Sequence, residues 1–420
     1  MADAAAPSVW RDPALADFRR LWAAQAVSAF GSRITRTVLP IIAISTLGVA
    51  ESMVGVLAAL QFAPGVVLAL FIGGTIDRGH KRRLLIGADV ARMLLVCSLA
   101  AAWALDALTI GHLIVVGAGV GAATALFGIT DNSYLPTLVA RARLVDANSR
   151  LEATDAIAEI GGPAAAGVLV RVVGAPLTVL VDAVTYLWSI AWLARIRAVE
   201  RPAPASASAA PARRARDLAL GMRVLFGHPT LRPLVLAQMA WAASGGFFMT
   251  LYSLYCLRTL QLDEATFGAI IGVGGLGALG GALVAPRLVA AVGLGRGLLV
   301  SATVSVGCEL LIPLAAGPLP VVVALLVTHQ LLGDGFRVAY QIHAVSLRQR
   351  LLPDEVLGRA NAALHVCTSG LLPIAALVAG GLADAFGTRT AVWVGVLLGL
   401  VAPVALWPVR RLRTAELPAA

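Results

Sequence analysis

The stretch "GGTIDRGHKRRLL", residues 73–85, concentrates six charged or titratable side chains into seven positions, in a chain where only 13% of residues are charged. Long apolar runs flank it at 53–76 and 84–105. An α-helix needs about 20 apolar residues to cross a bilayer core of about 30 Å, and both runs reach that length. The stretch therefore predicts a short polar loop that joins two membrane-spanning helices.

The same alternation of long apolar runs and short polar segments continues through all 420 residues, 59% of which are hydrophobic. Soluble domains are about 45–50% apolar and about 25% charged, so this composition favours a membrane protein. Only helices and closed barrels span a bilayer, and these runs are too long and too unalternating for barrel strands. We predict an all-α membrane protein with twelve transmembrane helices, near residues 20–47, 53–76, 84–105, 111–132, 151–173, 176–194, 231–257, 266–290, 297–316, 319–342, 361–382 and 390–409.

A segment rich in Pro, Ala, Ser and Arg, "RAVERPAPASASAAPARRARD", divides the predicted helices into two sets of six. Such a composition is typical of a flexible linker. The sequence thus predicts an N-terminal six-helix bundle at 1–196, a cytoplasmic linker at 197–217 and a C-terminal six-helix bundle at 218–420.

The two halves also resemble each other at one constant offset of 213 residues. This offset aligns Gln25 with Gln238 and, further along, Asn148 with Asn361. It also aligns Gly55 with Gly268 and Gly167 with Gly380. Since the offset holds at both ends of the unit, it indicates an internal duplication.

The distribution of basic residues predicts the orientation. Most of the 33 Lys and Arg lie in segments that share one side of the membrane if the N-terminus is cytoplasmic. The exceptions are Arg171, Arg258 and Arg389 outside and Arg33, Arg36, Arg92 and Arg337 within spans. The positive-inside rule then places both termini in the cytoplasm of a multi-pass protein of the cell (inner) membrane. The net charge of +10 is accordingly a topology signal, and no nucleic-acid partner is expected.

The sequence shows no convincing pattern for a metal site, a cofactor site or an enzyme active site. The four cysteines lie in apolar runs without a CxxC pair, and no GxxxxGK[ST] phosphate loop occurs. "GVGGLG" at 272–277 fits the dinucleotide fingerprint, but it lies inside an apolar run with no preceding strand. We expect Gly277 and Gly281 to serve helix packing instead, and we expect no enzyme, no cofactor and no metal.

The opening stretch, written as Gly73-x-x-x-Asp77-Arg78-x-x-x-Arg82-Arg83, resembles the loop signature of the major facilitator superfamily. Twelve helices, a central linker and two parallel repeats resemble the same superfamily. The resemblance implies that Asp77 holds the closed inner interface between the halves through helix-end dipoles or basic groups. It also implies that Gly73 allows close helix approach and that the arginines pair with acids across this gate. A role as topology determinants alone is the alternative.

Three further stretches carry a resemblance within that superfamily. "FRRLWAAQAVSAFGSRITRTVLP" (18–40) and "SYLPTLVARARLVDANSRLEA" (133–153) resemble its enterobactin-exporter and macrolide-efflux branch. "GGPAAAG" (161–167) resembles the glycine–proline motif of antiporters. That match implies that Pro163 bends or loosens the fifth span, and that Gly162 and Gly167 allow tight packing. Ordinary helix packing is the alternative.

Ionisable groups within spans are costly, about 2.5–3.5 kcal/mol on insertion scales, and so they are candidates for function. Their spacing puts Arg33 with Arg36 on one face of the first span, and Asp334 with Arg337 on one face of the tenth. Asp89 and Arg92 are spaced as a local ion pair. The resemblance implies that the first, fourth, seventh and tenth helices line a central cavity. The candidates for this cavity and for proton coupling are Arg33, Arg36, Asp131, Glu159, Asp334 and Arg337.

These features together predict a monomeric secondary transporter that exports a small amphipathic molecule, drug-like or siderophore-like, by proton antiport through alternating access. Asp334 is hypothesised to bind the proton, and a static buried ion pair is the alternative. Trp241 and Tyr252 are aromatic candidates for substrate contact, whereas Glu309 has no evident partner. The expected partners are the small-molecule substrate, protons and the lipid bilayer. A proton-coupled uptake permease for a small metabolite is the alternative function.

Overall fold

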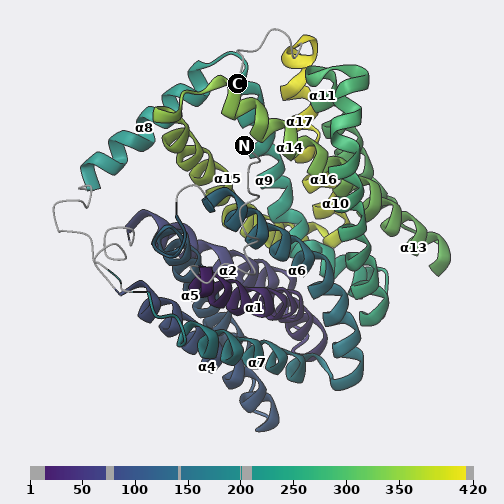
Figure 1. Cartoon of the computed structure of the whole chain (residues 1–420). Helices are drawn as coiled ribbons and strands as arrows, with labels where there is room; N and C mark the ends of the chain where they lie inside the picture. The colour runs from purple at the N-terminus through teal and green to yellow at the C-terminus, as the bar shows by residue number, and fades with distance from the viewer. Residues whose placement is uncertain (1–14, 72–79, 141–142, 199, 201–210, 413–420) are drawn as a thin grey trace.

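The computed structural model describes residues 15–71, 80–140, 143–198, 200 and 211–412, and these are helical apart from short connections (Figure 1). Twelve helical segments among the described residues are long and apolar enough to cross a membrane, which confirms the predicted number. The first six are α1 (Ala16–Ile41) with the π-helical turn η2 (Ile42–Thr46), α2 (Glu51–Phe71), α4 (Lys81–Ala104), α5 (Ile110–Leu138), α6 (Leu144–Val173) and α7 (Ala175–Leu193). The other six are α9 (Leu231–Leu254) with η5 (Tyr255–Thr259), α10 (Glu264–Val292), α11 (Leu294–Glu309) with α12 (Leu311–Leu314), α13 (Leu319–Thr328) with η6 (His329–Gly333) and α14 (Asp334–Leu351), α15 (Asp354–Phe386), and α16 (Thr388–Gly399) with α17 (Val401–Leu406) and η7 (Trp407–Arg411).

The helices pack as two groups that follow the order of the chain. In the first, α1 packs on α6 and α7, while α5 packs on α2 and α4. In the second, α9 packs on α15 and α16, and α14 packs on α10 and α11. Figure 1 shows the purple and blue helices of the first group as one lobe and most of the green and yellow helices as the other. The lobes meet where α2 packs on α15 and α6 packs on α10.

Backbone features confirm the internal duplication. The π-helical turns η2 (Ile42–Thr46) and η5 (Tyr255–Thr259) lie 213 residues apart, at the ends of equivalent helices. Gly174 and Gly387, separated by the same offset, precede α7 and α16 with φ of 82° and 84°. Glycine adopts such positive φ without strain, so both copies of the unit place it at the same tight connection.

Helix α10 shows how the sequence specifies its own boundaries. Asp263 caps its start, because the carboxylate accepts hydrogen bonds from the N–H groups of Ala265 (3.1 Å) and Thr266 (3.0 Å). These donors lower the pKa of Asp263. Gly293, with φ of 83°, ends the helix.

The glycines within α10 serve close helix packing, as predicted. A Cβ on Gly277 or Gly281 would collide with the backbone carbonyls of Leu331 and Gly335, which belong to η6 and α14. The "GVGGLG" stretch therefore lies inside a membrane-spanning helix and carries no dinucleotide loop.

The described part of the predicted linker differs from the expectation, because residues 211–217 begin a helix, α8 (Pro211–Gly227). Apolar side chains at helical spacing, Leu218, Met222 and Leu225, pack on α9 and α15. Asp217 also pairs with Arg359 at 3.0 Å. The Pro, Ala and Ser content suggested a flexible segment, whereas the Ala- and Arg-rich end of that segment has high helix propensity and leads into an amphipathic run.

The predicted Asp89–Arg92 ion pair is confirmed and is buried in the first lobe. Asp89 is 0% exposed and Arg92 is 3% exposed. The guanidinium also lies 4.6 Å from the ring centres of Phe127 and Tyr186. The pair thus joins α4 to α5 and α7 inside the lobe, away from the interface between the lobes.

Candidate transport cavity

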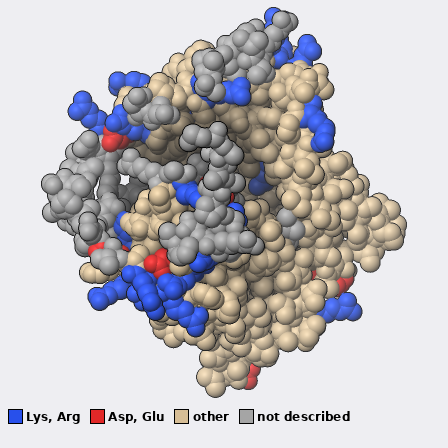
Figure 2. All heavy atoms as spheres, viewed as in Figure 1, with Lys and Arg blue, Asp and Glu red and all other residues tan. Residues whose placement is uncertain are grey.

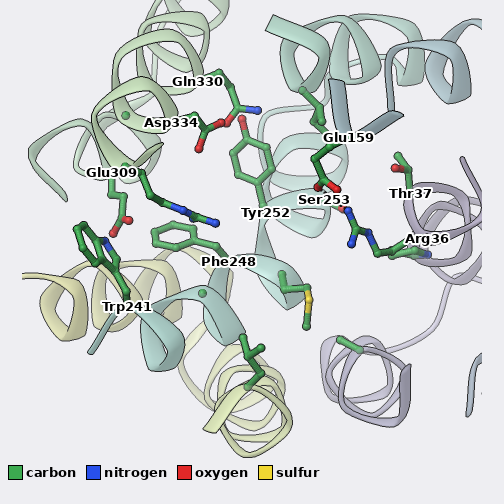
Figure 3. Close-up of a pocket in the computed structure, with 18 of the residues that line it drawn as sticks. Arg36, Thr37, Glu159, Trp241, Phe248, Tyr252, Ser253, Glu309, Gln330 and Asp334 are labelled. Atoms are coloured by element: carbon green, nitrogen blue, oxygen red, sulfur yellow. Dashed lines mark hydrogen bonds and ion pairs between the residues drawn. The ribbon is translucent and has the colours of Figure 1, made fainter. Parts of the chain in front are cut away.

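A cavity of about 460 Å³ lies between the two lobes (Figure 3). The first lobe contributes α1, α2 and α6 to its wall, and the second contributes chiefly α9, α11, η6 and α14. A second space of about 560 Å³ continues it along α6, α10 and α14 and shares much of its charged lining. The charged residues that line the first cavity, of about 460 Å³, are Arg36, Glu159, Glu309, Asp334 and Arg337. The cavity therefore brings together groups that are up to about 300 positions apart in sequence.

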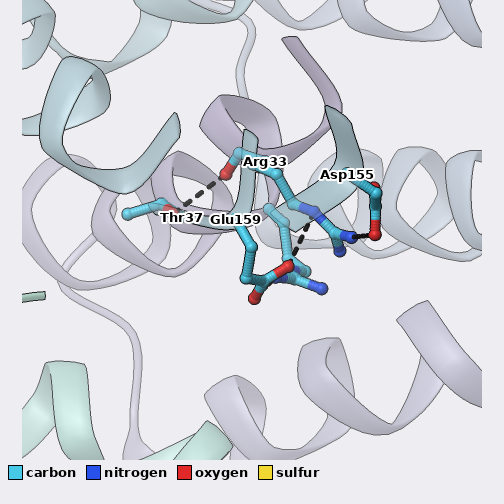
Figure 4. A network of polar contacts seen from close by, with 5 residues as sticks. Arg33, Thr37, Asp155 and Glu159 are labelled. Atoms are coloured by element: carbon cyan, nitrogen blue, oxygen red, sulfur yellow. Dashed lines mark hydrogen bonds and ion pairs between the residues drawn. The ribbon is translucent and has the colours of Figure 1, made fainter. Parts of the chain in front are cut away.

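A network of ion pairs joins α1 to α6 at the first-lobe wall (Figure 4), and of its members Arg36 and Glu159 line the cavity whereas Arg33 does not. Arg33 binds Asp155 at 2.6 Å and Glu159 at 2.7 Å, and Arg36 binds the other oxygen of Glu159 at 2.6 Å. Gly162 permits this arrangement, since a Cβ there would collide with the side chain of Arg33. Two arginines are thus balanced by two carboxylates.

The second-lobe wall contains two carboxylates and one arginine. Asp334 and Arg337 lie on α14, and Glu309 ends α11. Among the ion pairs that described residues form within 4.0 Å, none joins Arg337 to Asp334 or Glu309. Gly274 of α10 leaves room for the Asp334 carboxylate. The expected shared face of Asp334 and Arg337 is present, but the two side chains are not locked in an ion pair.

Glu309 is a cavity residue to which the sequence assigned no role. It is 6% exposed, and its Oε2 accepts a hydrogen bond from Ser244 of α9 at 3.3 Å. Gly399 of α16 lies next to the same oxygen, since a Cβ at position 399 would lie 2.8 Å from it. The available signal was a lone acid within an apolar run, and its partners lie on helices too distant in sequence for any spacing rule to find.

Aromatic side chains of α9 complete this wall. Trp241, Phe248 and Tyr252 line the cavity. Trp241 packs edge-on against Tyr340, with ring centres 4.5 Å apart. The Nε1 of Trp241 is buried and finds no hydrogen-bond partner among the described residues. Buried polar groups are normally paired, so this group is an exception.

One end of the cavity is closed by contacts between the lobes. On one side, the Cα atoms of Gly55 in α2 and Gly380 in α15 adjoin, and on the other those of Gly167 in α6 and Gly268 in α10. The repeat offset relates these two contacts, since it exchanges Gly55 with Gly268 and Gly167 with Gly380. The duplication therefore supplies both halves of the closure.

Among the contacts of the described residues, polar groups reinforce the side formed by α2 and α15. Arg258 of η5 lies 3.5 Å from Glu51 at the start of α2 and also donates to the carbonyl of Ile44 at 3.4 Å. The N–H of Ser52 donates to Asp384 of α15 at 3.1 Å. These contacts cross between the lobes, so they exist only while this end is closed.

The opposite face of the molecule is hollowed. Figure 2 shows a depression between the lobes, with Lys and Arg side chains along much of its rim. The uneven distribution of basic residues in the sequence thus has a counterpart on the open face.

The loop motif is only partly described. Gly73, Asp77 and Arg78 lie outside the described residues. The N–H of Arg82 donates to Glu200 at 2.8 Å, its guanidinium donates to the carbonyl of Ala194, and Arg83 is exposed. Both partners of Arg82 follow α7 in the first lobe, so the implied pairing across the lobes is not made by Arg82 in this conformation.

Of two other candidates, Asp131 lies away from the charged centre, whereas Pro163 lines the adjoining space of about 560 Å³. Asp131 of α5 is not placed on this cavity. Its carboxylate accepts a hydrogen bond from Gln25 of α1 at 2.5 Å, because this part of α5 turns toward α1. Pro163 is accommodated within α6, whose helix is continuous through it.

This arrangement, two packed bundles around a charged cavity, can be compared with known proteins. The sequence model of the Major Facilitator Superfamily matches residues 21–347. The chain belongs to this superfamily. It is therefore a multi-pass membrane protein that transports small molecules, and not an enzyme.

Relatives of this facilitator-superfamily transporter agree with that assignment. This chain is 27% identical over 370 residues to the multidrug efflux pump Tap of Mycolicibacterium fortuitum, and the match covers 84% of this chain and 87% of the pump. A bacterial homologue of the iron transporter ferroportin in an inward-facing state matches with a TM-score of 0.74 and 17% identity, over 94% of this chain and 98% of that one. The nucleoside transporter NupG matches with a TM-score of 0.72 and 12% identity, over 94% and 100%. At these identities the two structures show a shared fold.

Proposed function

We propose that this transporter exports small amphipathic molecules across the cell (inner) membrane by alternating access, in exchange for protons. The main observation behind this proposal is the cavity between the lobes, which is lined by aromatic side chains and by two carboxylates, Asp334 and Glu309, that form no ion pair with another described residue. The moving units are the bundles at 1–196 and 218–420, and the protein works as a monomer in the bilayer. The distant relationship to an efflux pump supports export over uptake.

The proposed orientation of the protein in the membrane follows from the distribution of its Lys and Arg side chains. The basic rim of the hollowed face favours the cytoplasmic side under the positive-inside rule. Both termini then lie in the cytoplasm, and the end closed by the glycine contacts faces outward. In this conformation the cavity loads from the cytoplasm. In the alternate state, Asp77 with Gly73 and the arginines Arg78, Arg82 and Arg83 close the inner mouth.

Proton coupling is assigned to the second-lobe carboxylates. Glu159 is held by two arginines, so its charge is already compensated by the protein. None of the described residues forms an ion pair with Asp334 within 4.0 Å, and a partly buried carboxylate without such a partner is stabilised by a proton. A proton that reaches Asp334 from the outward-open state changes the charge balance of the cavity and favours the return to the inward-open state.

Replacing Asp334 by Asn tests this coupling. Everted vesicles with an acidic lumen should accumulate an amphipathic dye when they contain the wild-type protein. The Asp334→Asn variant should lose about tenfold or more of this gradient-driven rate, as is usual when a positioned proton-transfer group is removed. Exchange of dye down its own gradient should continue, because the cavity and the gates are intact.

Asp106→Asn is the matched control, since Asp106 lies exposed in the α4–α5 connection with φ of 51°, a conformation that Asn tolerates. Unchanged proton dependence in Asp334→Asn would remove Asp334 from the mechanism. Accumulation only in right-side-out vesicles would replace export by uptake.

A further inference from the structure

We infer that the second-lobe wall of the cavity is a binding subsite for organic cations, with Glu309 as the residue that selects positive charge. This inference names the substrate class of the exporter proposed above and rests on that proposal. It follows from the charge balance of the two walls, from the position of Glu309 and from the aromatic side chains around it.

The two walls differ in charge. In the first lobe, Arg33 and Arg36 are matched by Asp155 and Glu159 in contacts of 2.6–2.7 Å. That wall offers no spare charge to a ligand. In the second lobe, Asp334 and Glu309 face the single guanidinium of Arg337. When both carboxylates are deprotonated, one negative charge there has no counterion among the described lining residues, and a cationic ligand supplies it.

The position of Glu309 allows its carboxylate to attract the positive charge of a ligand in the cavity. Glu309 lines the cavity yet is 6% exposed, so water screens it little. Ser244 holds one carboxylate oxygen at 3.3 Å, which fixes the direction of the group without neutralising it. In Figure 3 its carboxylate lies beside Trp241, at the edge of the cavity farthest from Arg36 and Glu159. A ligand at this position contacts the second lobe and stays away from the basic side chains of the first.

The aromatic wall fits the same ligand. Trp, Tyr and Phe faces attract cations, by about 0.5–2 kcal/mol according to desolvation, and they also stack on planar apolar groups. Trp241 is fixed in orientation by Tyr340, and Phe248 and Tyr252 follow it along α9. The Nε1 of Trp241, which is unpaired among the described residues, adds a hydrogen-bond donor for a polar substituent once the side chain adjusts to a ligand. A planar aromatic cation therefore satisfies every feature of this wall.

The cavity volume of about 460 Å³ suits a drug-sized molecule. An anionic chelator of the siderophore type meets an excess of negative charge at this wall. Between the two substrate classes expected from the sequence, the geometry thus favours the drug-like one, restricted to cations.

Binding of three probes to the purified full-length protein in phosphatidylcholine nanodiscs tests the inference. The probes are ethidium (a planar cation), chloramphenicol (neutral) and fluorescein (an anion), measured by equilibrium dialysis. The wild-type protein should bind ethidium more tightly than fluorescein. Glu309→Gln keeps the shape and the Ser244 contact, and it should weaken ethidium binding by about tenfold to thirtyfold while changing chloramphenicol binding less than about twofold. Trp241→Leu should weaken ethidium binding as well, and Asp106→Asn should change neither.

Fluorescein binding as tight as that of ethidium would overturn the inference. So would an equal loss for all probes in Glu309→Gln, since that pattern indicates a structural role. If ethidium binds with the expected Glu309 dependence but everted vesicles accumulate none of the probes, the export proposal fails and the subsite stands. If vesicles export chloramphenicol or fluorescein and ethidium does not bind, export stands and the subsite fails.

Discussion

Leucine in place of Gly167 is expected to lower the rate of transport by about tenfold to a hundredfold while the protein still inserts in the membrane. A Cβ at this position would lie 2.7 Å from the Cα of Gly268 and 3.2 Å from the carbonyl oxygen of Glu264. Both are backbone atoms, which no rotamer change can move. The larger side chain therefore forces α6 and α10 apart at the closed end.

The size of this effect follows from overpacking, which costs about 1–3 kcal/mol. That cost falls only on the state in which α6 and α10 touch. Since about 1.4 kcal/mol corresponds to a factor of ten, the population of the inward-open state falls accordingly. The initial rate of dye accumulation in everted vesicles measures the loss.

Gly280→Leu is the matched control for Gly167→Leu, because a Cβ on Gly280 of α10 meets nothing within 4 Å. It should retain a rate within about twofold of wild type, as surface changes away from such contacts usually have small effects. A wild-type rate in Gly167→Leu would show that the glycine contact does not take part in the transport cycle.

Alanine in place of Asp89 is expected to destabilise the protein by about 3–5 kcal/mol, because it leaves the buried guanidinium of Arg92 without its counterion. The rings of Phe127 and Tyr186 exclude water from that guanidinium. The melting temperature of the detergent-purified protein and the amount inserted in the membrane should both fall.

A second variant separates lost charge balance from lost packing at Asp89. Asp89→Asn combined with Arg92→Met removes both charges and should recover most of the stability. Asp146→Ala provides the surface comparison, since the Asp146–Arg150 pair spans 3.3 Å with side chains 45% and 32% exposed, and such pairs contribute about 1 kcal/mol or less. If Asp89→Ala melts within a degree of Asp146→Ala, the buried pair is not what stabilises the lobe.

The spacing rules predicted contacts within one helix better than contacts between helices. The Asp89–Arg92 pair, three residues apart on α4, followed from the helical period. The pairing of Arg33 and Arg36 with Asp155 and Glu159 did not, although the shared face of the two arginines was predicted, because a helical period says which residues share a face and not which helix that face meets. Asp131 shows the same limit, since its face of α5 meets Gln25 of α1.

The helical part of the linker was missed for a related reason. Composition predicts whether a segment can fold alone, and the composition of 197–217 predicts that it does not. Its end folds only because Leu218, Met222 and Leu225 find an apolar surface on α9 and α15.

By itself the sequence determined the number of spans and the duplication, and it predicts the side of the membrane that carries positive charge. Each of these depends on interactions between the chain and its solvent: apolar length against bilayer thickness, and basic residues against the membrane. Only the tertiary structure decided which carboxylates are compensated and which are free. Glu159 is held by two arginines, whereas Glu309 and Asp334 share one, and this balance depends on distances between helices that no local pattern encodes.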